Sequence, residues 1–363
     1  MNRYVVLISN FLVLLLLLLS CAEDNKYTVV NLSDKEKVLS NDKWIESIEF
    51  VHLEEDSLSL IGHIASIKES EDYWYVLDNR SNHKVVAFDK KGNYKCCYNK
   101  QGQGPGEYLA IYSMDVNPSN GNVYLLCPLK ILVLDKNLNF ANEISLPEVH
   151  YYRLAYHEDG LFLLAMNDTY IDYLSLSDNS LKRVSIIDGD KHDVPGPAPY
   201  FIKSDNKLFF HIESSDKVYK LSKEGLIPLL TLDYDYKKEA NKYYKKNIGN
   251  DLDPEKRIKY ARPILYSIVA EDDSIKSFIY SQFFFSICFN DSDKNYPLLI
   301  PAQNSMYYNN GSIISWMYAY EYNPDSFNQH HLYDNIKVNH LDWTIELQDS
   351  GNPIICIYKL KTE

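Results

Sequence analysis

The chain has 363 residues, 45% hydrophobic and 24% charged, which is the composition of a globular protein with ample material for a core. Its formal net charge of −13 at pH 7 argues against a nucleic-acid binder, because such a protein needs a basic surface to neutralise phosphates. All-β architectures often reach this length as one unit, so one large domain is as compatible with the length as two ordinary ones.

The amino terminus has the pattern of an export signal. Arg3 precedes an apolar run from Val5 to Leu19, which is shorter than the roughly 20 residues of a membrane-spanning helix. Residues 1–20 are therefore predicted to be a cleaved signal peptide, with an uncleaved anchor helix as the alternative. The segment from Leu18 to Cys21, "LLSC", resembles the bacterial lipobox. The resemblance implies that Cys21 becomes the first mature residue and carries acyl chains, which predicts an outer-membrane lipoprotein, periplasmic or surface-exposed.

The next segment, residues 21–43, is polar and charged, which predicts a tether between the lipid and the folded body. Beyond it, short strand-like runs recur with turns between them, for example "YWYVLD" (73–78) and "KVVAFDKKG" (84–92). The repeat steps are about 36 to 49 residues, with one step of about 70, and this is the range of propeller blades. The pattern favours an all-β fold.

The repeats predict a six-bladed β-propeller over residues 44–363. The sixth repeat ends after three strands, and the orphan run "SIEFVHLE" (47–54) can close it, which would leave no open sheet edge. The long step contains an insertion over about residues 235–262, between blades four and five, which we expect to form two short helices. It carries nine Lys and Arg against five acids, so it is either a solvated excursion or a lid or docking element for an anionic partner.

Blades one and two resemble the NHL-type propeller repeat. The matching residues are Asp78, Asn82-His83-Lys84, Phe88-Asp89, Gly92, Gly102 to Gly106, and Gly121-Asn122 with Tyr124. The chain also resembles the six-bladed β-propeller lipoproteins of Gram-negative gut bacteria, in which a GQGPGEY-like segment follows the first blade. This resemblance implies a cell-envelope propeller and no particular activity.

The loop "GQGPGEY" (102–108) does not fit a nucleotide-binding loop. The dinucleotide fingerprint requires GxGxxG followed by a helix, whereas here a strand-like run follows and no Lys-Ser/Thr pair is present. The loop instead predicts a crossover between blades, with no nucleotide as partner. Glu107 could cap the turn or face a ligand, and Tyr108 is a second candidate contact. Asp78, Asn79 and Arg80, at the end of a strand, are candidate ligand-facing residues as well.

Metal and cysteine chemistry are weakly indicated. His330, His331, His340 and Asp342 lie near one another in the sequence, but without the spacing of a known metal motif, so we predict no metal site. After Cys21, five cysteines remain, an odd number, and we interpret them as buried apolar residues. No cofactor is predicted. A metal-assisted enzyme, which is the alternative function, would require an ion such as calcium.

Two functions of different classes fit these residues. The first is a lipid-anchored binding or scaffold module for a glycan, peptide or protein partner, favoured by the anchor and by the absence of a catalytic motif. The second is a metal-assisted hydrolase or lyase that acts on an extracellular sugar or lactone through axial carboxylates. Three or more Asn, Asp or Glu side chains converging on the axis would favour the enzyme, and an aromatic plug would exclude it.

Overall fold

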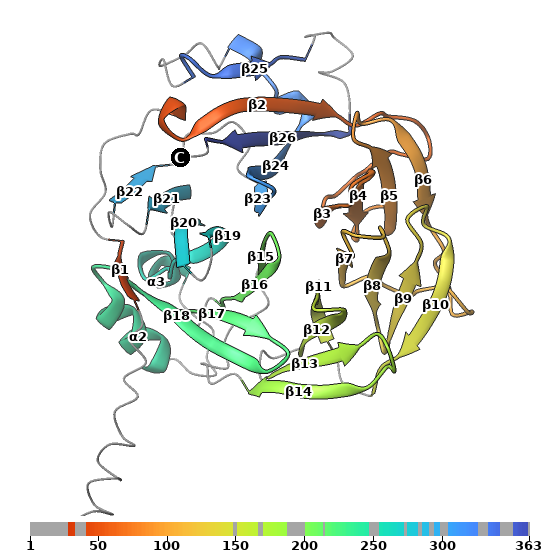
Figure 1. The fold of residues 1–363 in the computed structure, drawn as a ribbon, viewed down its shortest axis with the longest axis horizontal. Coiled ribbons are helices and arrows are strands. Elements are labelled where there is room, and N and C mark those ends of the chain that lie inside the picture. The colour runs from red at the N-terminus through yellow and green to blue at the C-terminus, as the bar shows by residue number, and fades with distance from the viewer. Residues whose placement is uncertain are drawn as a thin grey trace, which may run out of the picture.

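The computed structural model describes residues 28–32, 41–147, 151–165, 170–186, 200–212, 215–246, 254–271, 274–281, 285–289, 294–297, 304–325, 333–341 and 351–361. These residues form a mostly β-structure with a propeller-like arrangement of sheets around a central axis (Figure 1). Cys21 and the predicted signal peptide lie outside the described residues. Among the helices that the structure describes, none has the length and apolar character required to cross a membrane.

Four of the sheets have four strands each, and neighbouring strands in them are antiparallel. Sheet A contains β3 (Ser66–Glu69), β4 (Tyr73–Asp78), β5 (Lys84–Asp89) and β6 (Tyr94–Tyr98). Sheet B contains β7 (Ser113–Val116), β8 (Val123–Cys127), β9 (Lys130–Leu134) and β10 (Phe140–Ser145). Sheet C contains β11 (Tyr151–His157), β12 (Gly160–Ala165), β13 (Tyr170–Ser175) and β14 (Leu181–Ile186). Sheet D contains β19 (Ile264–Glu271), β20 (Ser274–Ser281), β21 (Phe285–Phe289) and β22 (Lys294–Pro297).

The fifth sheet has ten strands, in the order β1-β18-β17-β16-β15-β23-β24-β26-β2-β25. Its two halves meet at one parallel residue pair, Ser204 and Tyr308. The first half contains β15 (Phe201–Ser204), β16 (Lys207–Phe210), β17 (Lys217–Ser222), β18 (Gly225–Asp233) and β1 (Thr28–Asn31). The second half contains β23 (Asn304–Asn309), β24 (Ser312–Tyr318), β26 (Pro353–Leu360), β2 (Ile45–His52) and β25 (Lys337–Asn339).

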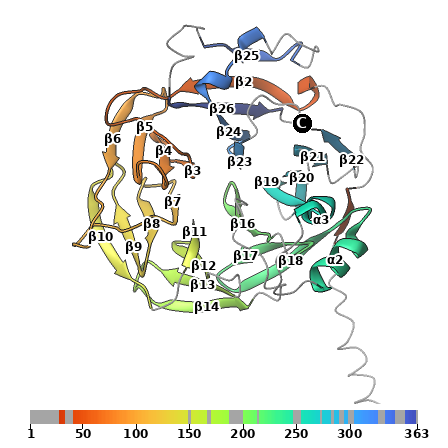
Figure 2. The same cartoon turned by 180° about the vertical axis from the view of Figure 1, so that it is seen from behind.

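The two ends of the chain pair with each other in the second half. Strand β2 is antiparallel to β26, with Ile48 opposite Tyr358 and Phe50 opposite Cys356, and β26 pairs with β24 on its other side. Strand β25 then adds to β2 in parallel, in the excursion that follows β24. Both views of the ribbon show these strands at one side of the ring (Figures 1 and 2). An amino-terminal strand thus lies inside the last strand group of the chain.

Strand sequence and position in the ring agree. The middle strands β4 and β5, with the sequences YWYVLD and KVVAFD, are continuous apolar runs and are almost entirely buried. A strand that packs on both faces reads as such a run, whereas a strand with one solvated face alternates. The outermost strands β10 and β14 are mostly exposed and carry polar residues. The apolar strands therefore lie between the neighbouring sheets, and the polar strands lie at the outside of the ring.

Hydrophobic clusters fill the interfaces between neighbouring strand groups. One cluster joins Tyr75 and Leu77 of sheet A to Leu125 of sheet B. Another joins Trp74 on the opposite face of sheet A to Trp316 and Ile355 in the second half of the ten-stranded sheet. Within the described residues there are six such clusters, each drawn mainly from two groups adjacent in the ring. The core is therefore distributed around the ring between its strand groups.

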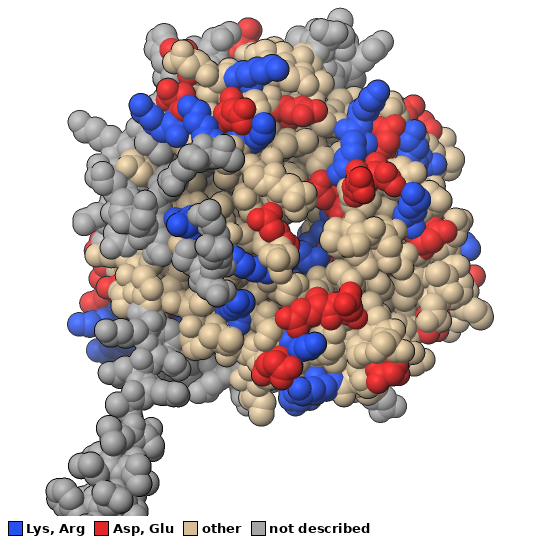
Figure 3. Space-filling view, in the orientation of Figure 1, with Lys and Arg blue, Asp and Glu red and all other residues tan. Residues whose placement is uncertain are grey.

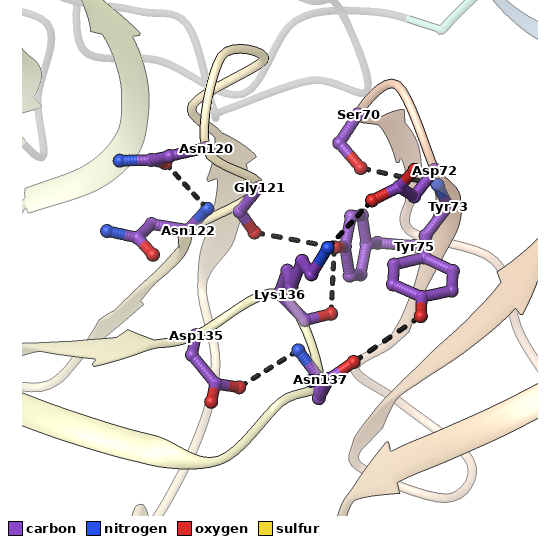
Figure 4. Close-up of polar contacts among 10 residues, drawn as sticks. All are labelled: Ser70, Asp72, Tyr73, Tyr75, Asn120, Gly121, Asn122, Asp135, Lys136 and Asn137. Atoms are coloured by element: carbon purple, nitrogen blue, oxygen red, sulfur yellow. Dashed lines mark hydrogen bonds and ion pairs between the residues drawn. The ribbon is translucent and has the colours of Figure 1, made fainter.

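Polar contacts support the same interfaces at their edges, as Figure 4 shows for sheets A and B. The buried Tyr75 hydroxyl donates to the carbonyl oxygens of Lys136, at 2.9 Å, and Gly121, at 3.3 Å. The Lys136 ammonium in turn pairs with Asp72 at 2.9 Å. Gly121 has a φ of 75°, and a Cβ there would lie 2.7 Å from Cβ of Lys136. The positive φ and the close approach of these two turns of sheet B, which both accept the Tyr75 hydroxyl of sheet A, therefore require glycine at position 121.

The insertion between β18 and β19 contains two helices, α2 (Lys237–Lys246) and α3 (Pro254–Lys259). Single 3₁₀ turns, η1 (Asn41–Lys43) and η2 (Ala319–Glu321), complete the described elements. The segment that the sequence suggested as a tether, residues 21–43, contains β1, which pairs with β18. Its polar composition concealed Val30 and Leu32, which are 0% and 2% exposed, and their burial explains why this part of the segment docks.

Candidate functional site

The innermost strands of the ring, among them β3, β7, β11 and β15, surround the axis (Figures 1 and 2). The space-filling view shows an opening near the centre of one face, with basic and acidic side chains at its edge (Figure 3). Short strands packed between sheets are normally apolar, and a charged residue in such a strand is costly to bury unless it is paired. Charged residues in the innermost strands therefore require an explanation.

Asp115 of β7 is the centre of the main ion-pair network. Its carboxylate lies 2.5 Å from Nζ of Lys203 in β15 and 3.7 Å from Nζ of Lys68 in β3. It also accepts a hydrogen bond of 2.7 Å from the backbone N–H of Tyr156 in β11. Asp115 is 2% exposed, whereas the side chains of Lys203 and Lys68 are 26% and 30% exposed. One buried carboxylate thus joins four strand groups, and its two lysines reach toward solvent.

The electrostatics of this network follow from burial and charge. Burial acts to raise the pKa of Asp115, but the charges of Lys203 and Lys68 outweigh it, and the net pKa is below the ordinary value. Burial lowers the pKa of Lys203, and the charge of Asp115 offsets this effect only in part. Burial also lowers the pKa of the neighbouring His157, whose imidazole lies 3.7 Å from Glu158. The lowered pKa favours the ionised form of Asp115, and its carboxylate holds the side chains of Lys203 and Lys68 near the axis.

A second network, centred on Glu69 of β3, lies beside the first. Its carboxylate pairs with Lys90 at 2.6 Å and accepts hydrogen bonds from Asn309 at 2.8 Å and Tyr307 at 3.4 Å, both in β23. The pKa of Tyr307 lies well above its ordinary value, first because of burial and then because of the charges of Glu69 and Asp115. The Glu69 carboxylate thus joins β3 of sheet A to β23 in the second half of the ten-stranded sheet.

The two networks together contain three ammonium groups, of Lys68, Lys90 and Lys203, and two carboxylates, of Asp115 and Glu69. The difference is one positive charge, in a chain whose formal net charge is −13. An ammonium at the edge of an opening can form a charge-assisted hydrogen bond with a carboxylate of a ligand. The arrangement is therefore suited to holding an anionic group and not to presenting free carboxylates.

Sequence comparison places the chain in a family. A family model described as "Domain of unknown function (DUF4934)" matches residues 27–359. The chain belongs to the DUF4934 family. No curated protein matches this DUF4934 chain in sequence.

Solved structures match this DUF4934 chain in fold. A candidate exported protein of Bacteroides fragilis superposes with a TM-score of 0.68 at 15% identity, over 92% of this chain and 100% of the other. A member of the DUF4221 family from Bacteroides vulgatus superposes with a TM-score of 0.52 at 11% identity, over 88% of this chain and 98% of the other. These likenesses support the propeller-like fold, and the first neighbour is by its name an exported protein.

The structure places Asp78 and its neighbours in a turn of sheet A. Asp78 is 0% exposed, and its carboxylate accepts hydrogen bonds from the backbone N–H groups of Gly62, at 2.8 Å, and Ser81, at 2.9 Å. Asn79 donates to the carbonyl oxygen of Ile111 at 3.3 Å, and Arg80 is exposed. Asp78 was one of the candidate ligand-facing residues, and its oxygens order the turn. Arg80 is the member of this group with an exposed side chain.

Glu107 and Tyr108, the other two candidates for ligand contact, hold the glycine-rich crossover. The Glu107 carboxylate accepts a hydrogen bond of 2.8 Å from the N–H of Gly104, which is the turn-capping role considered for it. A Cβ at Gly102 would lie 2.0 Å from that carboxylate, so a side chain would displace it. Tyr108 is 0% exposed, and its hydroxyl donates to the carbonyl of His83 at 2.5 Å. Burial in the cluster between sheets A and B removes Tyr108 from contact with solvent.

The structure describes only some of the candidate metal ligands and all of the cysteines after Cys21. His330, His331 and Asp342 lie outside the described residues, and His340 directly follows β25. The part of the chain that the structure describes contains no group of three or more His, Cys, Asp and Glu side chains able to hold a metal. The cysteines after Cys21 are all free thiols; three of them are buried and Cys96 and Cys97 are half-buried.

No sequence motif marks the axial residues, so they were not among the predicted site residues. Lys68, Asp115 and Lys203 each occur in a four-residue strand, in "SIKE", "SMDV" and "FIKS". Each strand opens a four-stranded repeat and carries a charged residue at its third position, where burial would favour an apolar side chain. That shared irregularity was a usable signal, since the first strand of a blade lies nearest the axis.

Proposed function

We propose that this chain is a cell-envelope lipoprotein with an NHL-like, six-bladed β-propeller that binds a carboxylate-bearing glycan or peptide in its axial channel. The six-bladed description counts sheets A to D as one blade each and the ten-stranded sheet as two. The six interfacial clusters and the single residue pair between the halves of that sheet support this count. The pairing of β2 with β26 supports closure by the amino-terminal strand.

The observation that carries the binding proposal is the shared carboxylate of Asp115. Two lysines from different sheets converge on it, so the network keeps an excess cation where Lys68 and Lys203 remain partly exposed. A purely structural ion pair requires one lysine, and the second ammonium beside Asp115 shares that carboxylate with the first. A ligand carboxylate placed beside these lysines would balance the charge. The channel would thus bind acidic ligands in preference to neutral ones of the same size.

The location proposed is the outer membrane, with the protein facing the periplasm or the cell surface. The exported nature stated for the Bacteroides fragilis neighbour agrees with an envelope protein. Lipidation of Cys21 rests on the lipobox-like sequence. The basic insertion remains a candidate docking element for an anionic partner.

The binding proposal predicts selectivity for charge. Titration of the purified protein with an oligogalacturonate, followed by calorimetry, is expected to give saturable binding that weakens as salt is added. A neutral galactan of equal length should not bind. Lys203→Met should weaken binding by about 10- to 100-fold, since a hydrogen bond to a charged group contributes about 1.5–3 kcal/mol.

The controls separate binding from folding. Lys68→Met removes the more distant ammonium and leaves the 2.5 Å pair of Lys203 with Asp115 intact, so it should weaken binding without unfolding the protein. Lys91→Met removes an exposed lysine whose ammonium has no ion-pair partner within the described residues, and it should leave binding unchanged. Equal binding of acidic and neutral oligosaccharides, or unchanged binding by both axial variants, would contradict the proposal.

A further inference from the structure

Strand β1 attaches the first described residues of the chain to one side of the ring. It pairs in parallel with β18 from Thr28, opposite Leu230, to Asn31, opposite Asp233. The backbone N–H of Leu32 donates to the carbonyl of Asp233 at 2.7 Å. Val30 and Leu32 belong to one buried cluster with Ala240 of α2. Strand β1, the end of β18 and α2 therefore form one packed unit, which we call the anchor rim.

The chain between the predicted lipid and the anchor rim is short. Cys21 and Thr28 are separated by the six residues "AEDNKY". A fully extended chain advances about 3.3–3.6 Å per residue, so Thr28 lies within about 25 Å of the lipidated residue. A folded body of this size has a radius of gyration of about 20 Å and is therefore roughly 50 Å across. Sheet A lies on the opposite side of the ring in Figure 1, so the short tether holds the anchor rim, and not sheet A, next to the lipidated residue.

The anchor rim carries a row of lysines. Lys238, Lys242 and Lys246 lie four residues apart on α2 and are all exposed. Residues at this spacing share one face of a helix. Lys237 differs from them, because its ammonium lies 3.5 Å from Asp216 and donates to the carbonyl of Leu232. Within the described residues, the three lysines of the row have no ion-pair partner. We call this row the lysine face.

We infer that the anchor rim faces the membrane and that the lysine face binds anionic lipid headgroups. The inference rests on the proposed lipidation of Cys21, which brings the rim to the bilayer surface. A basic helix beside a lipid anchor attracts anionic headgroups, and the two attachments act together in one orientation. The overall charge of −13 would otherwise repel an anionic surface, so the basic face is where contact is most favourable. The ring would then stand edge-on, with its axis parallel to the plane of the bilayer.

The test uses the lipidated full-length protein in nanodiscs. One set of discs contains phosphatidylglycerol and phosphatidylcholine, and the other phosphatidylcholine alone. An amine-reactive acetylating reagent labels exposed lysines, and mass spectrometry gives the rate for each. Lys238, Lys242 and Lys246 should react severalfold more slowly in the anionic discs than in detergent. Lys91, in the turn between β5 and β6, and Lys100, which follows β6, are also exposed, so they serve as internal controls and should react equally in all three conditions.

The outcomes distinguish the inference from the anchor on which it rests. A protein that fails to associate with either disc lacks the anchor, and both claims fall. A protein that associates while the lysine face reacts as fast as in detergent keeps the anchor and overturns the inference. Equal protection in both kinds of disc overturns the role of anionic headgroups. Protection confined to the anionic discs, and lost when Lys238, Lys242 and Lys246 are replaced in pairs by Gln, supports it.

Discussion

Asp115→Asn is expected to lower the free energy of unfolding by about 3–5 kcal/mol at pH 7, the usual cost of leaving a buried charge without its partner. The amide can still accept the hydrogen bond from Tyr156, but it no longer neutralises Lys203 and Lys68. Equilibrium unfolding in urea, followed by circular dichroism, measures the change. The effect should be among the largest for an isosteric substitution in this chain, because one side chain holds four strand groups together.

Asp72→Asn is the matched control. Asp72 pairs with Lys136 at 2.9 Å, but its side chain is 54% exposed and that of Lys136 is 49% exposed. Exposed pairs contribute about 0–1 kcal/mol, so this variant should stay close to the parent in stability. Similar losses for the two variants would mean that the axial network contributes no more to stability than an exposed ion pair does.

The stability difference between the parent protein and Asp115→Asn should depend on pH. The pKa of Asp115 is lower in the folded chain than in the unfolded chain, where it is about 3.9. A depressed carboxyl pKa contributes stability that is fully present above the unfolded value and is lost as pH falls through the folded value. The stability difference between the parent and Asp115→Asn should therefore be constant near neutral pH and shrink below about pH 4. A difference that grows on acidification would contradict the ionised state assigned to Asp115.

Cys21→Ala is expected to move the protein from the membrane fraction to the soluble fraction almost completely. Each buried methylene of an acyl chain contributes about 0.8 kcal/mol, and two or more chains anchor a protein stably whereas one does so only marginally. Phase partitioning in a detergent that separates on warming measures the change, and metabolic labelling with a palmitate analogue reports the acyl chains directly.

Cys97→Ala controls for the loss of a thiol as such. Cys97 is a free, half-buried cysteine of β6, and its removal should leave both labelling and partitioning unchanged. Lipidation of Cys21 would be refuted by a parent protein that takes up no palmitate analogue, or by a Cys21→Ala protein that still takes it up.

Repeat-level features of the fold were readable from the sequence because they depend on local chemistry. The continuous apolar runs of β4 and β5 and the glycine-containing turns between strands indicated the all-β, propeller-like arrangement. The orphan run at residues 47–54 overlaps β2, which pairs with β26. The pairing of these two strands, which are far apart in the sequence, was suggested only by the number of strands in each repeat. Strand β25 could not be anticipated, since three residues, "KVN", carry too little pattern to indicate pairing with β2.

The candidate site was less predictable because it is made by the ring and not by a motif. Lys68, Asp115 and Lys203 are far apart in the sequence, and their convergence depends on how the sheets are placed around the axis. Asp78 and Tyr108 were selected for their positions near turns, and such residues often satisfy backbone groups instead. The docking of β1, with its buried Val30 and Leu32, was hidden by the polar composition of residues 21–43 as a whole. In each case a contact between residues far apart in the sequence determined where the residue lies and what it binds.

The central claim is that a ligand carboxylate binds at the axis, and a crystal structure of the protein with a bound oligogalacturonate tests it most directly. Density for a carboxylate is expected within hydrogen-bond distance of Nζ of Lys203 or Lys68, about 2.7–3.2 Å. The Asp115 carboxylate should remain beside the same two lysines. Density for the ligand at the rim or on an outer strand, with the axial lysines unchanged and unoccupied, would contradict the claim.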